Sequence, residues 1–395
     1  MKSWPKKSAA ACVTISLLGA AAAMAQTAPK PAIVLPDPAD ASQWQKWAAE
    51  LGWQLLAPEI DAKIDADTRS RQLAEAVHTA VKNGTVDPAH VYLAGRGEET
   101  ALVFYIVSRV PDVWAAALAL GGSPKPALNA GRLFRANFTD TPVLWVSDGA
   151  GDDELAARLK TAGLNIEWRE GKGITIGQTF DELHKHTHSN FPVLADCETN
   201  TAKFGSCYWM EASKFDASER NDTLPSSRLL DGSGASLDLG AFGYKLTDPG
   251  PGVLISFLPK DYMGPLKTGD RLVELDGKQV ADGRDFDARL NGIYNEKTVS
   301  VMFQRGKERI RLDTRVVLPR PDALVTARVQ GRYDAADKSV RIVSRSVTEL
   351  RVNLPQEWAP AQLYWNGLAI ESLKQPGCYL LTVDKELLNA APCSE

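Results

Sequence analysis

The sequence predicts a multidomain chain, in which an α/β unit with a parallel sheet precedes β-rich segments. The chain has 395 residues, more than one ordinary hydrophobic core accommodates. Residues 31–190 alternate short apolar runs with amphipathic helical patterns, which is typical of a mostly parallel sheet covered by helices on both faces. From Ser236 onward the pattern changes to short strands separated by turn residues.

The N-terminus has the pattern of a secretory signal peptide. Three lysines precede an almost unbroken run of small and apolar residues at 8–23, and Ala23-Met24-Ala25 supplies a small-x-small cleavage site. The run is shorter than the ~20 residues that span a bilayer. We therefore expect a signal peptide over residues 1–25 and a mature protein that is periplasmic or secreted, with no stable membrane span after cleavage.

The first predicted domain covers residues 31–192. Apolar runs bounded by Pro, Gly or Asp predict its strands, and apolar residues at helical spacing predict its helices. The expected strands are 32–35, 53–56, 90–94, 115–120, 142–146 and 165–168. The expected helices are 44–51, 69–81, a segment that ends at Ser108, and 154–161.

Three segments of this domain resemble the α/β-hydrolase family. Residues 86–95 (VDPAHVYLAG) resemble the strand that leads into the family's nucleophile elbow. Residues 111–117 and 142–147 resemble the next strand and the strand that carries the family's acidic residue. The resemblance implies a hydrolase-like parallel sheet.

The nucleophile that the resemblance implies is absent from the sequence. The family's elbow needs G-x-S-x-G, a serine on a tight strand-to-helix turn. Residues 95–99 read Gly-Arg-Gly-Glu-Glu, so that Gly97 holds the nucleophile position and Glu99 replaces the closing glycine. Ser123 or Ser147 would have to act as a displaced nucleophile, and neither has an elbow sequence around it.

The partners of that nucleophile are also incomplete. Pro36-Asp37 stands where the family has His-Gly for its oxyanion hole, and no histidine occurs at 173–177, where the base is expected. Asp152 or Asp153 remains as a candidate acid. We therefore expect no catalytic residues and an inactive scaffold; the alternative is a hydrolase with an unconventional active site on this domain.

Histidines and cysteines raise the question of a metal. His184, His186 and His188 have ligand spacing on a strand, and the outer two also on a helix. No matching carboxylate or cysteine set lies nearby, so we expect exposed histidines, no metal site and no cofactor.

Four cysteines remain after the predicted cleavage, and they form two local pairs. Cys197 with Cys207, and Cys378 with Cys393, are expected to form disulfides in an oxidising compartment. Their spacings fit neither a C-x-x-C redox pair nor a zinc knuckle. The first pair lies in residues 193–230, which we expect to be a disulfide-containing connector.

Residues 231–320 have the pattern of a separate β-rich module. Expected strands are 253–258, 271–275, 278–280, 299–305 and 309–316, with a short helix at 285–290. The stretch LKTGDRLVELDGKQV at 266–280 combines a turn into a core strand with a tight Asp276-Gly277 turn out of it. This module resembles the PDZ domain in the arrangement found in bacterial exported proteases.

The PDZ resemblance implies a peptide-binding groove. Such a domain adds a peptide as an extra strand and holds its terminal carboxylate on consecutive backbone N–H groups. The loop that holds the carboxylate would be residues 239–242. One side chain from this loop and one from the following strand would flank the groove, and the helix would form its other wall. The expected peptide-binding residues are Leu239, Gly240, Ala241, Phe242, Gly243, Tyr244, Phe286, Arg289 and Leu290. For Leu239 and Leu290 an ordinary core position is the open alternative.

Residues 321–395 are expected to form a small β-rich domain, whose role the sequence does not indicate. Asn366-Gly367 predicts a two-residue hairpin turn. The expected function of the whole chain is therefore non-catalytic binding of peptide or protein C-termini, or of extended strands, after export. A structural protein whose groove is filled by its own linker is a further alternative. The net charge of −4 and the lack of a basic patch exclude nucleic acid as an expected partner.

Overall fold

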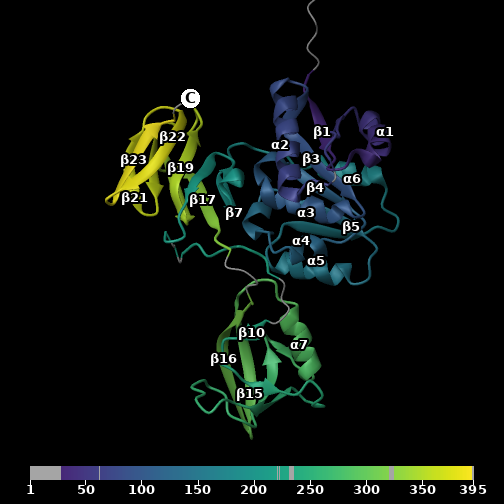
Figure 1. Cartoon of the computed structure of the whole chain (residues 1–395), viewed down its shortest axis with the longest axis vertical. Coiled ribbons are helices and arrows are strands. Elements are labelled where there is room, and N and C mark those ends of the chain that lie inside the picture. The colour runs from purple at the N-terminus through teal and green to yellow at the C-terminus, as the bar shows by residue number, and fades with distance from the viewer. Residues whose placement is uncertain are drawn as a thin grey trace, which may run out of the picture.

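The computed structural model describes residues 28–61, 63–219, 221, 223–230, 235–319 and 324–393. The predicted signal peptide lies outside these residues. The chain forms an α/β domain, a β-sandwich beside it, and a third unit below both in the view of Figure 1. Within the described part, no helix is both long and apolar enough to cross a membrane.

The α/β domain contains a six-stranded sheet in which every neighbouring pair is parallel. The strands are β1 (Lys30–Val34), β2 (Gln54–Leu56), β3 (Val86–Arg96), β4 (Ala116–Leu120), β5 (Val143–Ser147) and β6 (Ile166–Glu170). Their order is β2-β1-β3-β4-β5-β6. The predicted parallel α/β sheet is thus confirmed, with strand ends within a few residues of those expected.

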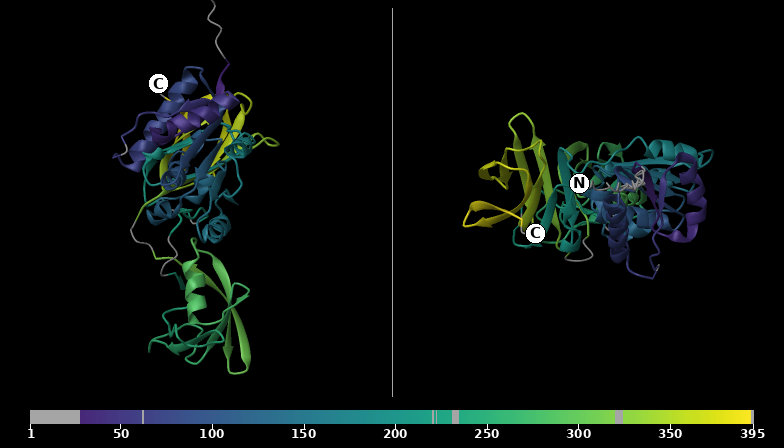
Figure 2. Two further views of the ribbon diagram at one scale, coloured as in Figure 1. Left: turned by 90° about the vertical axis from the view of Figure 1, so that its right-hand side faces the viewer. Right: turned by 90° about the horizontal axis from the view of Figure 1, so that it is seen from above.

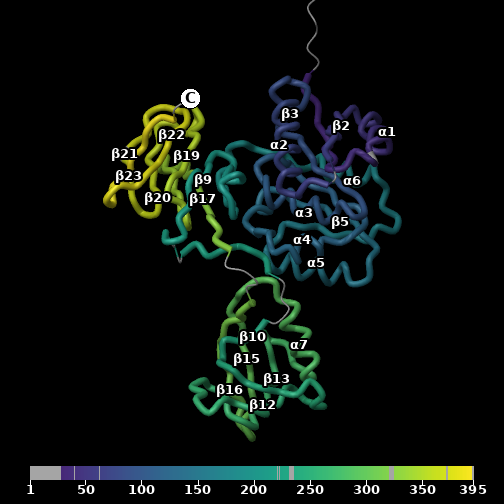
Figure 3. Tube along the Cα trace, viewed as in Figure 1, coloured from purple at the N-terminus to yellow at the C-terminus, as the bar shows by residue number. Residues whose placement is uncertain are grey.

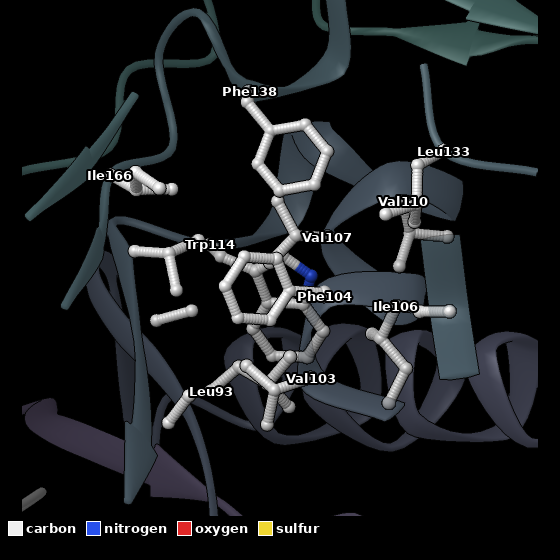
Figure 4. Packing of buried hydrophobic residues seen from close by; sticks show 14 of the residues in the cluster. Leu93, Val103, Phe104, Ile106, Val107, Val110, Trp114, Leu133, Phe138 and Ile166 are labelled. Atoms are coloured by element: carbon white, nitrogen blue, oxygen red, sulfur yellow. The ribbon is translucent and has the colours of Figure 1, made fainter. Parts of the chain in front are cut away.

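Helices cover both faces of this sheet. One core cluster joins the sheet to α2 (Ala66–Lys82), α3 (Glu99–Arg109), α4 (Lys125–Asn129) and α5 (Asp152–Thr161). The other joins it to α1 (Ala41–Leu51) and α6 (Ile176–Leu183). Figure 4 shows the first cluster, in which the rings of Phe104, Trp114 and Phe138 fill the space between α3 and the sheet. Short 3-10 turns complete the domain at Pro38–Asp40, Pro111–Val113 and Arg135–Phe138.

The β-sandwich consists of two five-stranded sheets, whose orders are β21-β20-β18-β17-β7 and β23-β22-β19-β9-β8. The first contains β7 (Leu194–Thr199), β17 (Ala327–Asp334), β18 (Ser339–Arg345), β20 (Ala361–Trp365) and β21 (Leu368–Leu373). The second contains β8 (Ser206–Cys207), β9 (Met210–Phe215), β19 (Val347–Leu354), β22 (Gly377–Asp384) and β23 (Leu387–Pro392). A 3-10 turn at Ala202–Phe204 connects β7 to β8. Asn366 and Gly367 have φ of 48° and 87° between β20 and β21, the left-handed conformation that the predicted hairpin turn requires.

Two of these strands correct the prediction for residues 193–230. Strand β7 pairs antiparallel with β17, and β9 pairs antiparallel with β19, so this segment contributes to both sheets. The expected connector is therefore part of the sandwich, and the predicted boundary at residue 321 cuts through a domain. Its partner strands lie more than a hundred residues later in the chain, and local sequence patterns do not reveal such pairings.

The third unit is consequently an insertion between β9 and β17, which we call the inserted module (residues 235–319). Its sheet has the order β10-β16-β15-β13-β12-β11, with β14 on β13. The strands are β10 (Ser236–Leu237), β11 (Gly243–Tyr244), β12 (Val253–Phe257), β13 (Arg271–Leu275), β14 (Lys278–Gln279), β15 (Thr298–Arg305) and β16 (Glu308–Val317), with helix α7 at Gly283–Asn291. Its buried core comes from residues between 230 and 318 alone. Figures 2 and 3 show the module as a body separate from the other two domains.

Both predicted disulfides are confirmed. Cys197 and Cys207 are bridged with Cα atoms 5.8 Å apart, and because one lies in β7 and the other in β8, the bridge joins the two sheets. Cys378 and Cys393 are bridged with Cα atoms 5.4 Å apart, and they join β22 to the end of β23. Disulfides of this kind are characteristic of proteins that fold in oxidising compartments.

Candidate functional site

The inserted module has a strand with one unpaired side at the end of its sheet. Strand β11 is the last strand in the sheet order, and it pairs only with β12, through Gly243 with Phe257 and Tyr244 with Ile255. Its other edge has no strand partner among the described residues. An open edge of this kind can accept an added strand.

The loop before β11 presents several free hydrogen-bond donors. Gly240 is exposed and has φ of 78°, a left-handed conformation that glycine adopts without strain. The backbone N–H groups of Gly240, Ala241 and Phe242 have no acceptor in the described part of the chain. Consecutive N–H groups around a left-handed residue form a concave anion site, called a nest. The loop can therefore receive a carboxylate beside the open edge.

Aromatic rings line the start of this edge. Phe242 and Tyr244 are half-buried, with ring centroids 6.1 Å apart. Tyr244 also meets the ring of Phe286 edge to face at 5.4 Å. Burial, together with the negative charge of Asp287, raises the pKa of the Tyr244 hydroxyl.

Of the helix residues predicted as the opposite wall, two are buried and one forms an ion pair. Phe286 is fully buried, and Leu239 and Leu290 are each 4 % exposed, so all three belong to the core. The side chain of Arg289 forms an ion pair with Asp285 at 2.8 Å. Arg289 also lines a hollow of about 390 Å³ that includes residues of α5 in the α/β domain. The core alternative therefore describes the positions of Leu239 and Leu290.

The open part of the edge is short. A Cβ placed on Gly283, the first residue of α7, would lie 2.8 Å from the carbonyl oxygen of Lys245. Helix α7 therefore packs directly on the chain just after β11, and glycine is needed for this approach. Backbone pairing with a ligand is restricted to the few residues next to the loop.

Tyr262 is a residue of this site that the sequence analysis missed. Its hydroxyl donates a hydrogen bond to the carbonyl oxygen of Leu239 at 2.5 Å. A Cβ on Gly240 would lie 2.8 Å from its ring, so the ring packs against the loop. Tyr262 stands in an irregular segment between two strands, and no local pattern distinguishes it from an ordinary loop residue.

The turn predicted as a nucleophile elbow lies between a strand and a helix of the α/β domain. Gly97 lies between β3 and α3 with φ of 61°, and its N–H donates to the carbonyl oxygen of Leu120. A Cβ built there would meet no atom within 4 Å, so the position opens into free space. The strand–turn–helix expected for a nucleophile is present without a hydroxyl.

A carboxylate that is neither of the two predicted acids lies beside the expected base position. Asp148, just after β5, accepts a hydrogen bond from the N–H of Lys172 at 3.0 Å. Lys172 directly precedes residues 173–177, where the hydrolase resemblance places a base. Asp152 is instead buried in the first turn of α5, and Asp153 follows it in that turn.

The two candidate serines have different surroundings. Ser147 is buried, and its hydroxyl accepts a hydrogen bond from the indole N–H of Trp168 at 2.9 Å. Ser123 accepts the N–H of Lys125 at 3.4 Å. Among the described residues, no histidine ring contacts either hydroxyl.

The three histidines at 184–188 have different environments. The ring of His184 lies 5.4 Å from that of His90, whereas His188 stacks on Tyr208 at 5.6 Å. The backbone carbonyl of His186 accepts the hydroxyl of Tyr92. In the described ranges no group of three or more His, Cys, Asp or Glu side chains is arranged to hold a metal ion.

Comparisons with known proteins identify one part of the chain. The family model for the PDZ domain matches residues 240–316, which contain the loop, the edge strand and α7. No curated protein matches the chain. A solved structure titled "Crystal structure of esterase PE8" is similar with a TM-score of 0.28 and 19 % identity, over 40 % of this chain and 90 % of that one. At this TM-score the similarity supports no conclusion about fold or activity.

Proposed function

We propose that this protein is exported and binds the free C-termini of peptides or proteins through its PDZ domain. The observation that supports this best is the position of the free N–H groups of residues 240–242 directly before the unpaired edge of β11. A terminal carboxylate accepts hydrogen bonds from these groups, and the preceding residues of the ligand pair with β11. Hydrogen bonds to an ionised acceptor are about twice as strong as neutral ones, so the terminal charge contributes a large share of the affinity.

The ligand class follows from the surroundings of the loop. Phe257 pairs with Gly243 across the sheet and is 61 % exposed, and Met263 beside the loop is 96 % exposed. Exposed apolar side chains next to a binding loop favour an apolar partner. We therefore propose that the preferred ligands end in apolar residues.

We further propose that the α/β domain is a non-catalytic scaffold. The supporting observation is Gly97, which occupies the elbow without a side chain. A serine-directed fluorophosphonate should not label the purified protein. Stoichiometric labelling at one serine would instead support the alternative, a hydrolase with an unconventional active site.

The proposed location is the periplasm or the extracellular space. It is supported by the signal-peptide pattern at residues 1–25 and by the two disulfides. Mass spectrometry of the protein from its native cells tests it. An exported protein lacks the first 25 residues and has both pairs oxidised, whereas an intact N-terminus with free thiols would contradict export.

The binding proposal is tested with fluorescently labelled peptides and the chain without residues 1–25. Each peptide is made with a free carboxylate and as the C-terminal amide, and binding is measured by fluorescence anisotropy. We expect the acid forms with apolar ends to bind at least tenfold more tightly than their amides. Equal binding of acid and amide would contradict the carboxylate site.

A pair of glycine variants separates the site from the fold. Gly240 and Gly277 have φ of 78° and 77°, so Gly240→Ala and Gly277→Ala impose similar backbone strain. Only Gly240 lies in the loop, and a Cβ on Gly277 would meet nothing within 4 Å. We expect Gly240→Ala to weaken binding of the acid peptides severalfold and Gly277→Ala to leave it unchanged.

A further inference from the structure

We infer that Tyr262 is a positioning residue, which keeps the carboxylate loop of the PDZ domain in the orientation that presents N–H groups. This inference rests on the proposed function and names the residue on which its selectivity for carboxylates depends. Tyr262 lies outside the loop, between β12 and β13, and acts on it through a tertiary contact.

The hydroxyl of Tyr262 has two partners. It donates to the carbonyl oxygen of Leu239 at 2.5 Å and accepts the N–H of Leu266 at 3.3 Å. Leu266 is 3 % exposed and belongs to the core of the module. The hydroxyl is thus hydrogen-bonded to the core of the module through Leu266 and to the loop through Leu239.

The bond to Leu239 fixes the direction of a donor in the loop. In a trans peptide the C=O of one residue and the N–H of the next point in opposite directions. Because the Leu239 carbonyl is turned toward Tyr262, the N–H of Gly240 is turned away from it. Rotation of this peptide plane would exchange the donor for a carbonyl oxygen, which repels a carboxylate.

The loop has little else that prevents this rotation. The N–H of Asp238 donates to Arg315 and that of Leu239 to Leu237, whereas the N–H groups of 240–242 have no acceptor in the described ranges. Glycine at position 240 accepts both signs of φ at similar free energy. The orientation of the Leu239–Gly240 peptide therefore depends on the contact with Tyr262.

Two glycines make room for this contact. A Cβ on Gly240 would lie 2.8 Å from the ring of Tyr262, and a Cβ on Gly264 would overlap its hydroxyl. The ring therefore fits between these two backbone segments. The tyrosine thus forms a hydrogen bond to the loop, and the two glycines leave the space that its ring occupies. A surface residue without a role would need neither feature.

The test removes one oxygen atom. Tyr262→Phe keeps the ring and deletes the hydroxyl, and Tyr379→Phe is the matched control, because its hydroxyl donates to the carbonyl of Gln375 at 2.8 Å in the sandwich. Both variants are made in the chain without residues 1–25. Affinities for an acid peptide and its amide are measured by anisotropy, and melting temperatures are recorded for each protein.

We expect Tyr262→Phe to weaken binding of the acid peptide about three- to tenfold, the effect of one lost hydrogen bond, and to leave the amide unchanged. The ratio of the two affinities should fall by the same factor, while Tyr379→Phe behaves as the wild type. A purely structural role would weaken acid and amide equally, and that result would overturn the inference.

The outcomes separate this inference from the proposed function. Wild-type protein that prefers the acid, with a Tyr262→Phe variant that prefers it equally, overturns the inference and leaves the function. Wild-type protein that does not distinguish acid from amide overturns both. If Tyr262→Phe melts too early for titration, protein labelled with ¹⁵N-glycine gives a second readout. The amide signal of Gly240 should then shift or broaden at low temperature relative to Gly277, and an unchanged Gly240 signal would overturn the inference.

Discussion

At the scale of single residues, Glu198 is the carboxylate that holds distant segments of the chain together. It is 1 % exposed, and its oxygens accept hydrogen bonds from the hydroxyls of Ser226, Ser227 and Thr326 and from the N–H of Ser227. The two serines precede the PDZ domain and Thr326 follows it. In all four contacts the carboxylate of Glu198 is the acceptor.

Glu198→Gln should therefore destabilise the protein markedly. The amide keeps the shape but places an NH₂ donor against hydrogen-bond donors, and we expect a loss of about 2 kcal/mol in the free energy of unfolding. Chemical denaturation followed by tryptophan fluorescence measures it. Glu211→Gln is the control, because Glu211 pairs with Arg351 at the surface and should change stability by less than ~0.5 kcal/mol. Equal effects of the two variants would show that Glu198 does not have this role.

Asp270 should make the PDZ domain sensitive to acid. Burial opposes its charge, but hydrogen bonds from Arg305 and from the N–H of Lys267 outweigh burial and hold the pKa of the Asp270 carboxyl below its usual range. A carboxyl whose folded pKa is lowered stabilises the fold above its unfolded pKa of about 3.9, and this contribution disappears as the pH falls through the folded pKa. We expect Asp270→Asn to be less stable than the wild type at pH 7, with the difference shrinking below about pH 4. Melting curves from pH 7 to pH 2.5 measure this difference; a constant difference would contradict the assignment.

Some of these residues were predictable from sequence and others were not. The left-handed conformation of Gly240 could be predicted, because its neighbours have a recognisable order in which this position takes a glycine. Gly97 could be recognised for the same reason, through the strand and helix around it. Tyr262 and Glu198 could not, because Leu239 is 23 residues from Tyr262 and Thr326 is 128 residues from Glu198 in the sequence, and only the fold brings them together.

At the scale of secondary-structure elements, the two disulfides should differ in their importance. Loops of 10 and 15 residues give nearly equal entropic contributions, a difference of about 0.4 kcal/mol. Their surroundings differ more, since Cys197 and Cys207 are buried between two sheets, whereas Cys378 is exposed beside a hairpin. The buried pair also contributes to the sandwich core.

We therefore expect the double variant Cys197→Ala with Cys207→Ala to lose about 3 to 5 kcal/mol. Cys378→Ala with Cys393→Ala should lose about 3 kcal/mol or less, because it leaves no cavity in the core. Mild reductant should also open the exposed bridge first, which thiol alkylation and mass spectrometry detect. Faster reduction of the buried bridge would contradict this ranking.

The predicted elements agree best with the structure where strands and partners follow one another in sequence. In the α/β domain each strand is followed by a helix and joins its neighbours by short crossovers, so alternation alone indicates the layer structure. Strand β7 is different, because Asp196 and Glu198 interrupt its apolar pattern. Arg328 lies in the neighbouring strand β17 and forms an ion pair with Asp196, with 2.6 Å between their side-chain atoms. The charges of Arg328 and Asp196 are therefore paired only once β17 is in place.

At the scale of the whole molecule, the PDZ domain is inserted into a sandwich that is bound to the α/β domain. The side chain of Asn137 donates to the carbonyl of Glu198 and accepts its N–H, and Arg109 of α3 donates to Asn200. The PDZ domain contacts the α/β domain through the ring of Tyr294, over which the guanidinium of Arg158 lies at 5.9 Å. The α/β domain and the sandwich therefore form the platform on which the PDZ domain is carried.

This arrangement predicts that the PDZ domain can be removed without unfolding the platform. Because Ser227 and Thr326 donate to the same carboxylate, a short Gly-Ser linker in place of residues 231–323 can connect the two ends. We expect the shortened protein to form both disulfides and to keep its near-ultraviolet circular dichroism and its melting temperature within a few degrees. Residues 230–319 alone should fold and bind acid peptides, since their core is self-contained. A shortened protein that is molten or has mispaired disulfides would show instead that the sandwich needs the PDZ domain in order to fold. The hydrogen bonds of Glu198 would then result from that folding and would not be what joins the two ends of the insertion.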